Sequence, residues 1–262
     1  MSDFASPALS LRGVGISFRG VRALDDVTID VPAGGVTAVI GPNGAGKTTL
    51  FNCIGGIYRH QGEIDLYGAS IGHLRAHQRA ERGIARTFQT PALLDHAPVW
   101  DNVLLGANAW ARSGIIGGAI STRRSRREDA EARDAARDAV EAVGVESLVR
   151  RSAGSLAHAD RRRVEVARTL VSRPRLLMLD EPAAGLSAGE ADELLALVAA
   201  YGERTGMTAV LVEHDVSLVM RTARWIAVLD AGRLLATGTP RQIQENPAVV
   251  AAYLGTEVEV ES

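Results

Sequence analysis

The chain has 262 residues and a formal net charge of −2, and 46% of its residues are apolar but only 4% aromatic. This length suits one large α/β core with a smaller part attached, and the charge argues against general affinity for nucleic acid or anionic lipid. The single cysteine, Cys53, excludes an internal disulfide and is typical of a reducing cytoplasm. The sequence shows no signal-peptide pattern and no apolar run near the ~20 residues that span a bilayer. We therefore expect any membrane role to depend on a partner.

The first informative segment in chain order is the apolar run 36–40, which predicts a buried strand. The next nine residues fit the phosphate-binding pattern GxxxxGK followed by Ser or Thr: Gly41, Pro42, Asn43, Gly44, Ala45, Gly46, Lys47, Thr48 and Thr49. Apolar residues at 50–54 supply the helix that this motif requires. We expect Lys47, the only lysine of the chain, to reach the β- and γ-phosphates of a nucleotide while the Thr48 hydroxyl binds Mg²⁺. The alternative is a glycine-rich turn with an incidental lysine, which the strand–loop–helix context disfavours.

Three further segments predict strands that end in polar side chains: 84–88 before Gln89, the apolar run 176–179 before Asp180 and Glu181, and the apolar run 208–212 before Glu213 and His214. In an open parallel sheet, ligands bind beyond the carboxyl ends of the strands. Because successive strand residues point to opposite faces, Asp180 can face a magnesium ion while Glu181 addresses the water beside the γ-phosphate. Each feature alone is weak, since a histidine after a strand is usually structural. Together with the phosphate loop they predict a nucleotide site.

With these motifs the chain resembles the ATP-binding cassette (ABC) family over essentially its whole length. Residues 41–49 resemble the Walker A motif of that family and residues 176–181 its Walker B motif, while Gln89 matches the Q-loop and His214 the switch histidine. The resemblance implies ATP and Mg²⁺ as cofactors and Glu181 as the catalytic carboxylate. It also implies that His214 contacts the γ-phosphate, and that Gln89 binds Mg²⁺ or water and senses a transmembrane partner. Such chemistry depends on positioning and charge stabilisation.

The resemblance implies an α/β fold: a P-loop NTPase core with a mixed, largely parallel sheet, an N-terminal antiparallel β subdomain and an inserted α-helical subdomain. We expect residues 1–90 and 164–238 to form the nucleotide-binding core, residues 91–163 the helical subdomain and residues 239–262 a C-terminal helix and tail, all within one ABC domain. Residues 128–143 predict a helix with few apolar anchors that faces mostly solvent.

Phe18 lies about where the family places an aromatic side chain that stacks on adenine. Stacking on a base tolerates many sequences, so position alone supports this role. The alternative is an ordinary core phenylalanine of an edge strand.

Several stretches resemble one branch of the family, the ATP-binding subunits of branched-chain amino acid importers: 85–89, 179–186 and 246–255. Relatives of this branch also import urea, short amides or aromatic acids. The resemblance implies three partners, namely a second ABC ATPase subunit, transmembrane permease subunits and an extracytoplasmic substrate-binding protein. It places the chain at the cytoplasmic face of the membrane. The alternatives are a soluble ABC ATPase, disfavoured by the single cassette and the lack of a coiled-coil insertion, and a regulatory subunit with little hydrolysis.

The resemblance breaks at the signature segment, where the family usually has LSGGQ. Here the segment contains Ser155, Leu156, Ala157, His158, Ala159 and Asp160. In the family this helix start contacts the γ-phosphate of ATP held by the opposite subunit, so the Ala159 methyl group and the Asp160 carboxylate both oppose that contact. Residues 161–163, all arginines, could offset the charge, although we expect at least two of them to be plain surface residues. We therefore expect a slow or non-hydrolytic composite site at this signature, which favours a non-identical partner ATPase.

Overall fold

A computed structural model describes residues 6–87, 93–109 and 123–257. The larger sheet has the strand order β10-β9-β3-β8-β7-β6. Its strands are β3 (Gly35–Ile40), β6 (Ile84–Arg86), β7 (Leu176–Asp180), β8 (Thr208–Val212), β9 (Trp225–Asp230) and β10 (Arg233–Gly238). All pair in parallel except β10, which runs antiparallel to β9. Every residue of β7 and β8 is buried, as expected for strands covered on both faces.

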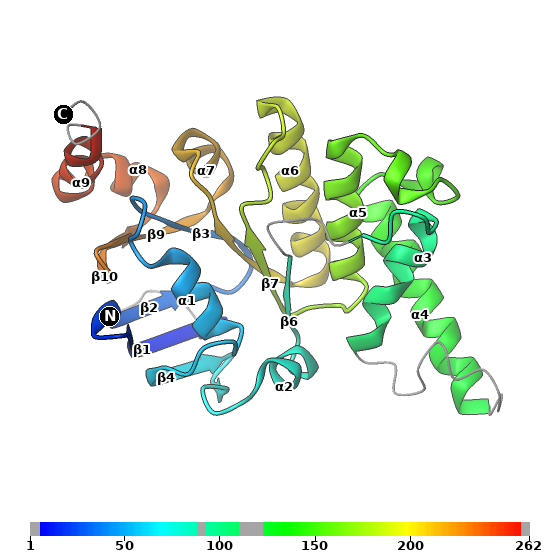
Figure 1. Ribbon diagram of the computed structural model, residues 1–262, viewed down its shortest axis with the longest axis horizontal. Coiled ribbons are helices and arrows are strands. Elements are labelled where there is room, and N and C mark those ends of the chain that lie inside the picture. Colours follow the sequence, from blue (N-terminus) through cyan, green and yellow to red (C-terminus); the bar gives the residue numbers. More distant parts are fainter. Residues whose placement is uncertain (1–5, 88–92, 110–122, 258–262) are drawn as a thin grey trace.

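The smaller sheet is antiparallel and has the order β2-β1-β4-β5. Its strands are β1 (Leu9–Phe18), β2 (Val21–Val31), β4 (Gln61–Leu66) and β5 (Ala69–Ser70). Helix α1 (Lys47–Ile54) lies beside both sheets, as Figure 1 shows. One apolar cluster joins Leu24 of β2, Leu50 of α1 and Met178 of β7, so the helix that follows the phosphate loop is packed between the two sheets.

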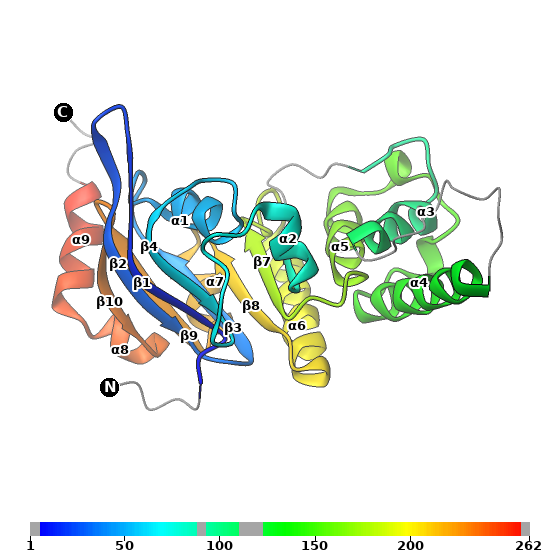
Figure 2. The same cartoon turned by 90° about the horizontal axis from the view of Figure 1, so that it is seen from below.

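The remaining helices are α2 (Ala76–Glu81), α3 (Val99–Leu104), α4 (Arg123–Ala142), α5 (His158–Leu170), α6 (Ala188–Thr205), α7 (Val216–Thr222), α8 (Pro240–Gln244) and α9 (Pro247–Glu257), with short 3-10 turns η1 (Leu105–Ala109), η2 (Glu146–Leu148) and η3 (Ala153–Ser155). Helices α3, α4 and α5 lie together at one end of the molecule (Figure 2). No helix of the described residues is both long and apolar enough to cross a bilayer.

Helix α4 differs from its prediction on one face. Ala132, Ala135, Ala136 and Ala139 are buried in the same apolar cluster as α5 and α6. Alanine contributes little area but lets helices approach closely, so a helix rich in Ala and charged residues packs here instead of facing mostly solvent.

The α/β fold with an antiparallel β part and added helices is confirmed. The division of the chain into 1–90 with 164–238, 91–163 and 239–262 stays a prediction.

Arg79 of α2 fixes the far end of α1. Its side chain is 2% exposed. Nη1 donates to the carbonyls of Cys53 (2.6 Å) and Ile54 (2.7 Å) at the end of α1, while Nε and Nη2 donate to Leu74 and Gly72. The last carbonyls of a helix lack partners within it, and a cation there also suits the helix dipole. One buried guanidinium therefore ties α2 to the helix that carries the phosphate loop.

Arg79→Met should lower the free energy of unfolding by about 3 kcal/mol, because several buried carbonyls lose their donors at once. Denaturant unfolding of the two proteins measures this difference. The matched control is Arg133→Met, at an exposed arginine of α4, which should change stability by no more than about 0.5 kcal/mol. Equal unfolding midpoints for the two variants would contradict the anchoring role.

Candidate nucleotide-binding site

The phosphate loop connects β3 to α1, and its glycines stand where the backbone passes close to other strands. A Cβ on Gly41 would lie 2.1 Å from the carbonyl oxygen of Leu229, and a Cβ on Gly46 would lie 2.8 Å from that of Ala23. Gly46 also has a φ of 98°, in the left-handed region that disfavours side chains. Any larger residue at these positions would push the loop away from β9 and β2.

Lys47 begins α1 and is 5% exposed. Its Nζ donates to the carbonyl oxygens of Gly41 (2.7 Å) and Pro42 (3.0 Å). Burial lowers the pKa of Lys47, while the nearby negative charge of Glu181 raises it. The ammonium group is thus held within its own loop, close to the predicted catalytic carboxylate.

A cavity of about 320 Å³ opens beside this loop. Its lining residues are Ala23, Asn43, Gly44, Ala45, Gly46, Lys47, Thr48, Thr49 and His214. The structure therefore brings together the phosphate loop, the predicted magnesium ligand Thr48 and the predicted γ-phosphate contact His214. A positively charged hollow at a helix N-terminus suits a phosphate group.

Glu181 and His214 contact each other across the tips of β7 and β8. His214 Nε2 lies 2.8 Å from Glu181 Oε1, and an ionised carboxylate only accepts, so Nε2 is then the donor. Glu181 has a φ of 49°, a conformation that costs a non-glycine residue about 1 kcal/mol or more and that is frequent at functional sites. The strained turn places the Glu181 carboxylate beyond the end of its strand.

Glu213 supports this pair, although sequence reasoning assigned it no role. It is 6% exposed, and its carboxylate accepts from the backbone N–H groups of Ala183 (2.8 Å) and His214 (3.2 Å). Burial raises the pKa of Glu213, while these two hydrogen bonds lower it. Glu213 joins the segment after β7 to the segment after β8. A polar residue at the end of an apolar strand was the only signal for it.

Asp180 is 2% exposed, and its Oδ2 accepts from Arg86 Nη2 at 2.6 Å. Its Oδ1 is buried without a hydrogen-bond partner among the described residues. A buried carboxylate oxygen without a donor fits a metal ion or a metal-bound water. The described residues contain no cluster of three or more His, Cys, Asp or Glu side chains that could hold a metal. This donor set suits Mg²⁺, which usually completes its shell with phosphate oxygens and water.

The site roles of Gln89 and Phe18 stay predictions. Gln89 lies outside the described residues. Phe18 ends β1, is 42% exposed and packs edge-to-face on Tyr58, with 5.1 Å between ring centroids. Its exposure makes the core-phenylalanine alternative wrong, and its stacking on adenine stays a prediction.

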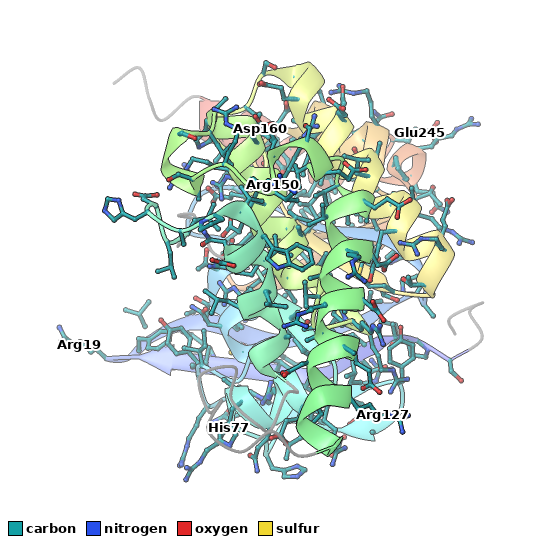
Figure 3. The ribbon with its side chains drawn as sticks, turned by 90° about the vertical axis from the view of Figure 1, so that its right-hand side faces the viewer. Arg19, His77, Arg127, Arg150, Asp160 and Glu245 are labelled. Carbon is teal, nitrogen blue, oxygen red and sulfur yellow. The ribbon has the colours of Figure 1, made fainter. Side chains whose placement is uncertain are left out.

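The signature segment leads into α5, which begins at His158 with Ala157 as its N-cap. Leu156 is buried, whereas Ser155, Ala157 and His158 are exposed. Helices α3, α4 and α5 form a helical lobe, and Figure 3 shows Asp160 at the opposite end of this lobe from Arg127. The start of α5 is therefore open to solvent, as a contact with a second subunit requires.

The expectation that at least two arginines of 161–163 are plain surface residues is wrong. Their side chains are 22%, 5% and 18% exposed and form ion pairs: Arg161 with Asp95, Arg162 with Glu165, and Arg163 with Glu193. They pair with acidic residues of several segments because α5 packs inside the helical lobe. None of these pairs involves Asp160.

Tyr253 of α9 was also not foreseen. Burial raises the pKa of the Tyr253 phenol to about 12, against a hydrogen bond with the Gly41 backbone that lowers it. The C-terminal helix therefore contacts the first residue of the phosphate loop.

The family described as "ABC transporter" matches residues 24–184, and the one described as "Branched-chain amino acid ATP-binding cassette transporter" matches residues 233–259. The chain is 42% identical over 250 residues to the high-affinity branched-chain amino acid transport ATP-binding protein BraF of Pseudomonas aeruginosa, covering 95% of this chain and 98% of the relative. It is 40% identical over 252 residues to the LivG protein of Escherichia coli K12, which carries the same description, covering 96% and 99%.

A similar solved structure is the ADP conformation of an ATP-binding cassette of an ABC transporter, with a TM-score of 0.82, 29% identity and coverage of 96% of this chain and 100% of the other. A nucleotide-free cassette from an ABC transporter has a TM-score of 0.80 and 29% identity, covering 94% and 98%. Sequence and structure agree over nearly the full length of these relatives. The chain therefore belongs to the ABC transporter family, as one of its ATP-binding cassettes.

Proposed function

We propose that the chain binds and hydrolyses ATP to power an importer of branched-chain amino acids or of related amides or urea. The named relatives are branched-chain amino acid transport proteins and match this chain nearly end to end. The match at 233–259 adds the C-terminal helix to this resemblance. The observation that carries the proposal is the buried Lys47 ammonium in its loop, facing the hydrogen-bonded Glu181 and His214.

In this proposal the loop 41–49 surrounds the phosphates of ATP, and Lys47 exchanges its two carbonyl partners for phosphate oxygens. Thr48, Asp180 and Gln89 hold Mg²⁺, which neutralises charge on the phosphates. Glu181 orients the attacking water and accepts its proton, while His214 holds Glu181 in place and contacts the γ-phosphate. Prearranged charges of this kind act without covalent chemistry by the protein.

We further propose that the chain works as half of an ATPase dimer at the cytoplasmic face of the membrane, with permease subunits and an extracytoplasmic substrate-binding protein. The exposed start of α5 supports a contact with a second ATPase subunit. The departures at Ala159 and Asp160 favour a subunit that is not identical to this chain. Cargo is then selected by the partners.

A groove of about 460 Å³ between α2, β6, η1 and α5 supports the permease contact. Its lining includes Ile57, Ala76, Ala80, Ile84 and Ala85. Ile57 is 55% exposed and lines this groove, so its apolar side chain is accessible to a partner. The groove also borders Arg86 and Thr87, just before Gln89, so a permease segment seated there would lie next to the nucleotide site.

Two substitutions test the function by separating binding from hydrolysis. Lys47→Ala should weaken Mg²⁺-dependent ATP binding about 10- to 100-fold, because a charged hydrogen-bond donor is lost. Glu181→Gln should keep binding but lower phosphate release about 10²- to 10⁴-fold. The control Glu203→Gln, at an exposed position of α6, should change neither. Unchanged ATP affinity in Lys47→Ala would contradict the proposal. If the unsubstituted chain, in its complex, bound ATP without hydrolysing it, a regulatory subunit would be favoured.

The signature departures predict a gain of activity on repair. Ala159→Gly with Asp160→Gln should raise phosphate release by the full complex about fivefold, the effect of removing about 1 kcal/mol of charge repulsion at a helix start. The control is Asp134→Gln, at a carboxylate of α4 that is 65% exposed. Unchanged turnover in the repaired variant would show that this signature is already competent.

The groove predicts where the permease docks. Ile57→Asp should abolish co-purification of the chain with its permease, because a charge would be buried in an apolar contact. ATP binding by the separate chain should be unaffected. Val21→Asp, at a 71% exposed side chain of β2, is the control and should leave the complex intact. A stable complex with Ile57→Asp would place the docking surface elsewhere.

A further inference from the structure

Arg86, the last residue of β6, has no role assigned in the nucleotide site and yet contacts it directly. Its side chain is 14% exposed. Nη2 donates to Asp180 Oδ2 at 2.6 Å and Nη1 donates to Asn52 Oδ1 at 2.7 Å. The guanidinium carbon lies 5.7 Å from the centre of the Phe51 ring. Partners on β7 and α1 thus fix the guanidinium in one orientation.

The hydrogen bond from Arg86 fixes the orientation of the Asp180 carboxylate. Arg86 occupies Oδ2 alone, and Oδ1 stays buried without a hydrogen-bond partner among the described residues. The backbone N–H of Asp180 lies 3.4 Å from the Thr87 hydroxyl, so the residue after Arg86 adds a second, weaker hold. One oxygen of Asp180 is therefore used by the protein, and the other remains available to a ligand.

A buried carboxylate needs a compensating charge, and Arg86 supplies it within the chain. Metal ligands in proteins are commonly oriented by a further hydrogen-bonded residue, whose loss typically lowers metal affinity about 10- to 100-fold. The Asn52 bond and the Phe51 contact give Arg86 the rigidity that such a role requires, because the guanidinium cannot swing away from Asp180 without losing both.

We propose that Arg86 is a positioning residue that holds Asp180 through Oδ2 and so presents Oδ1 to the magnesium ion of bound Mg²⁺–ATP. The proposal rests on the proposed function, since it assigns a device to the same site. The competing interpretation is an ion pair that only joins β6 to β7. It predicts lower stability without any change in metal affinity.

The test uses the full-length chain with Glu181→Gln, which slows hydrolysis, and Mn²⁺ as the probe, with free Mn²⁺ measured by electron paramagnetic resonance in the presence of ATP. Arg86→Met should raise the Mn²⁺ concentration at half-saturation about tenfold. Arg86→Lys keeps the charge but cannot hold Asp180 and Asn52 together, and it should also raise that concentration. Arg12→Met removes a pair of equal length, 2.6 Å to Asp30 on the β1–β2 ribbon, and should leave it unchanged.

A double-mutant cycle with Asp180→Asn separates positioning from general damage. Without the Asp180 charge, Arg86→Met should change Mn²⁺ half-saturation less than twofold. ATP binding measured without divalent metal should be the same with Arg86→Lys and with Arg12→Met, and thermal unfolding checks that each variant is folded. If Arg86→Met does not fold, Arg86→Lys carries the comparison.

Mn²⁺ half-saturation unchanged by both Arg86 substitutions would overturn the inference and leave the ATPase function standing. If Arg86→Met changed Mn²⁺ half-saturation equally with Asp180 and with Asp180→Asn, the inference would be overturned too. If the chain with Arg86 and Asp180 unchanged showed no Mn²⁺-dependent ATP binding, the proposed function itself would be wrong, and with it this role for Arg86.

Discussion

The Lys47 ammonium group is held by two carbonyl oxygens of its own loop, and the architecture around it keeps that arrangement in place. A cation only 5% exposed has lost most of its water, so it needs oxygen atoms at fixed positions. Gly41 and Pro42 provide them at 2.7 and 3.0 Å. Phosphate oxygens can replace these carbonyls with a full opposite charge, so the loop is prepared for an anion before one arrives.

The rest of the fold holds this loop from several sides. The backbone of Leu229 in β9 lies close to Gly41, and the backbone of Ala23 in β2 lies close to Gly46. Arg79 binds the far end of α1, while Tyr253 of the C-terminal helix reaches the Gly41 backbone. Elements of both sheets and helix α9 therefore meet at this loop. A shift in any of these elements would therefore change the phosphate site.

Sequence reasoning found the parts of this site that are coded locally. Lys47 and Thr48 follow from a contiguous motif, and Asp180, Glu181 and His214 follow from strand ends that a parallel sheet brings to one edge. Arg86 and Tyr253 were missed because their partners are 94 and 212 residues away (Asp180 and Gly41), and no local pattern marks either contact. The error at 161–163 has the same origin, since the acidic partners of Arg161 and Arg163 come from other segments.

The candidate site is open to solvent on one side. His214 is 50% exposed and Thr48 is also exposed, so the cavity that both residues line is open to water on this side. Charges act far more strongly on a reacting phosphate once water is excluded, and no described residue closes that side. The exposed start of α5 on the same chain has the backbone N–H groups to cover a phosphate but lies in the helical lobe, away from its own loop. In the dimer proposed above, the start of α5 of a second cassette would close this open side, and exclusion of water there is the electrostatic reason to expect that ATP turnover needs the dimer.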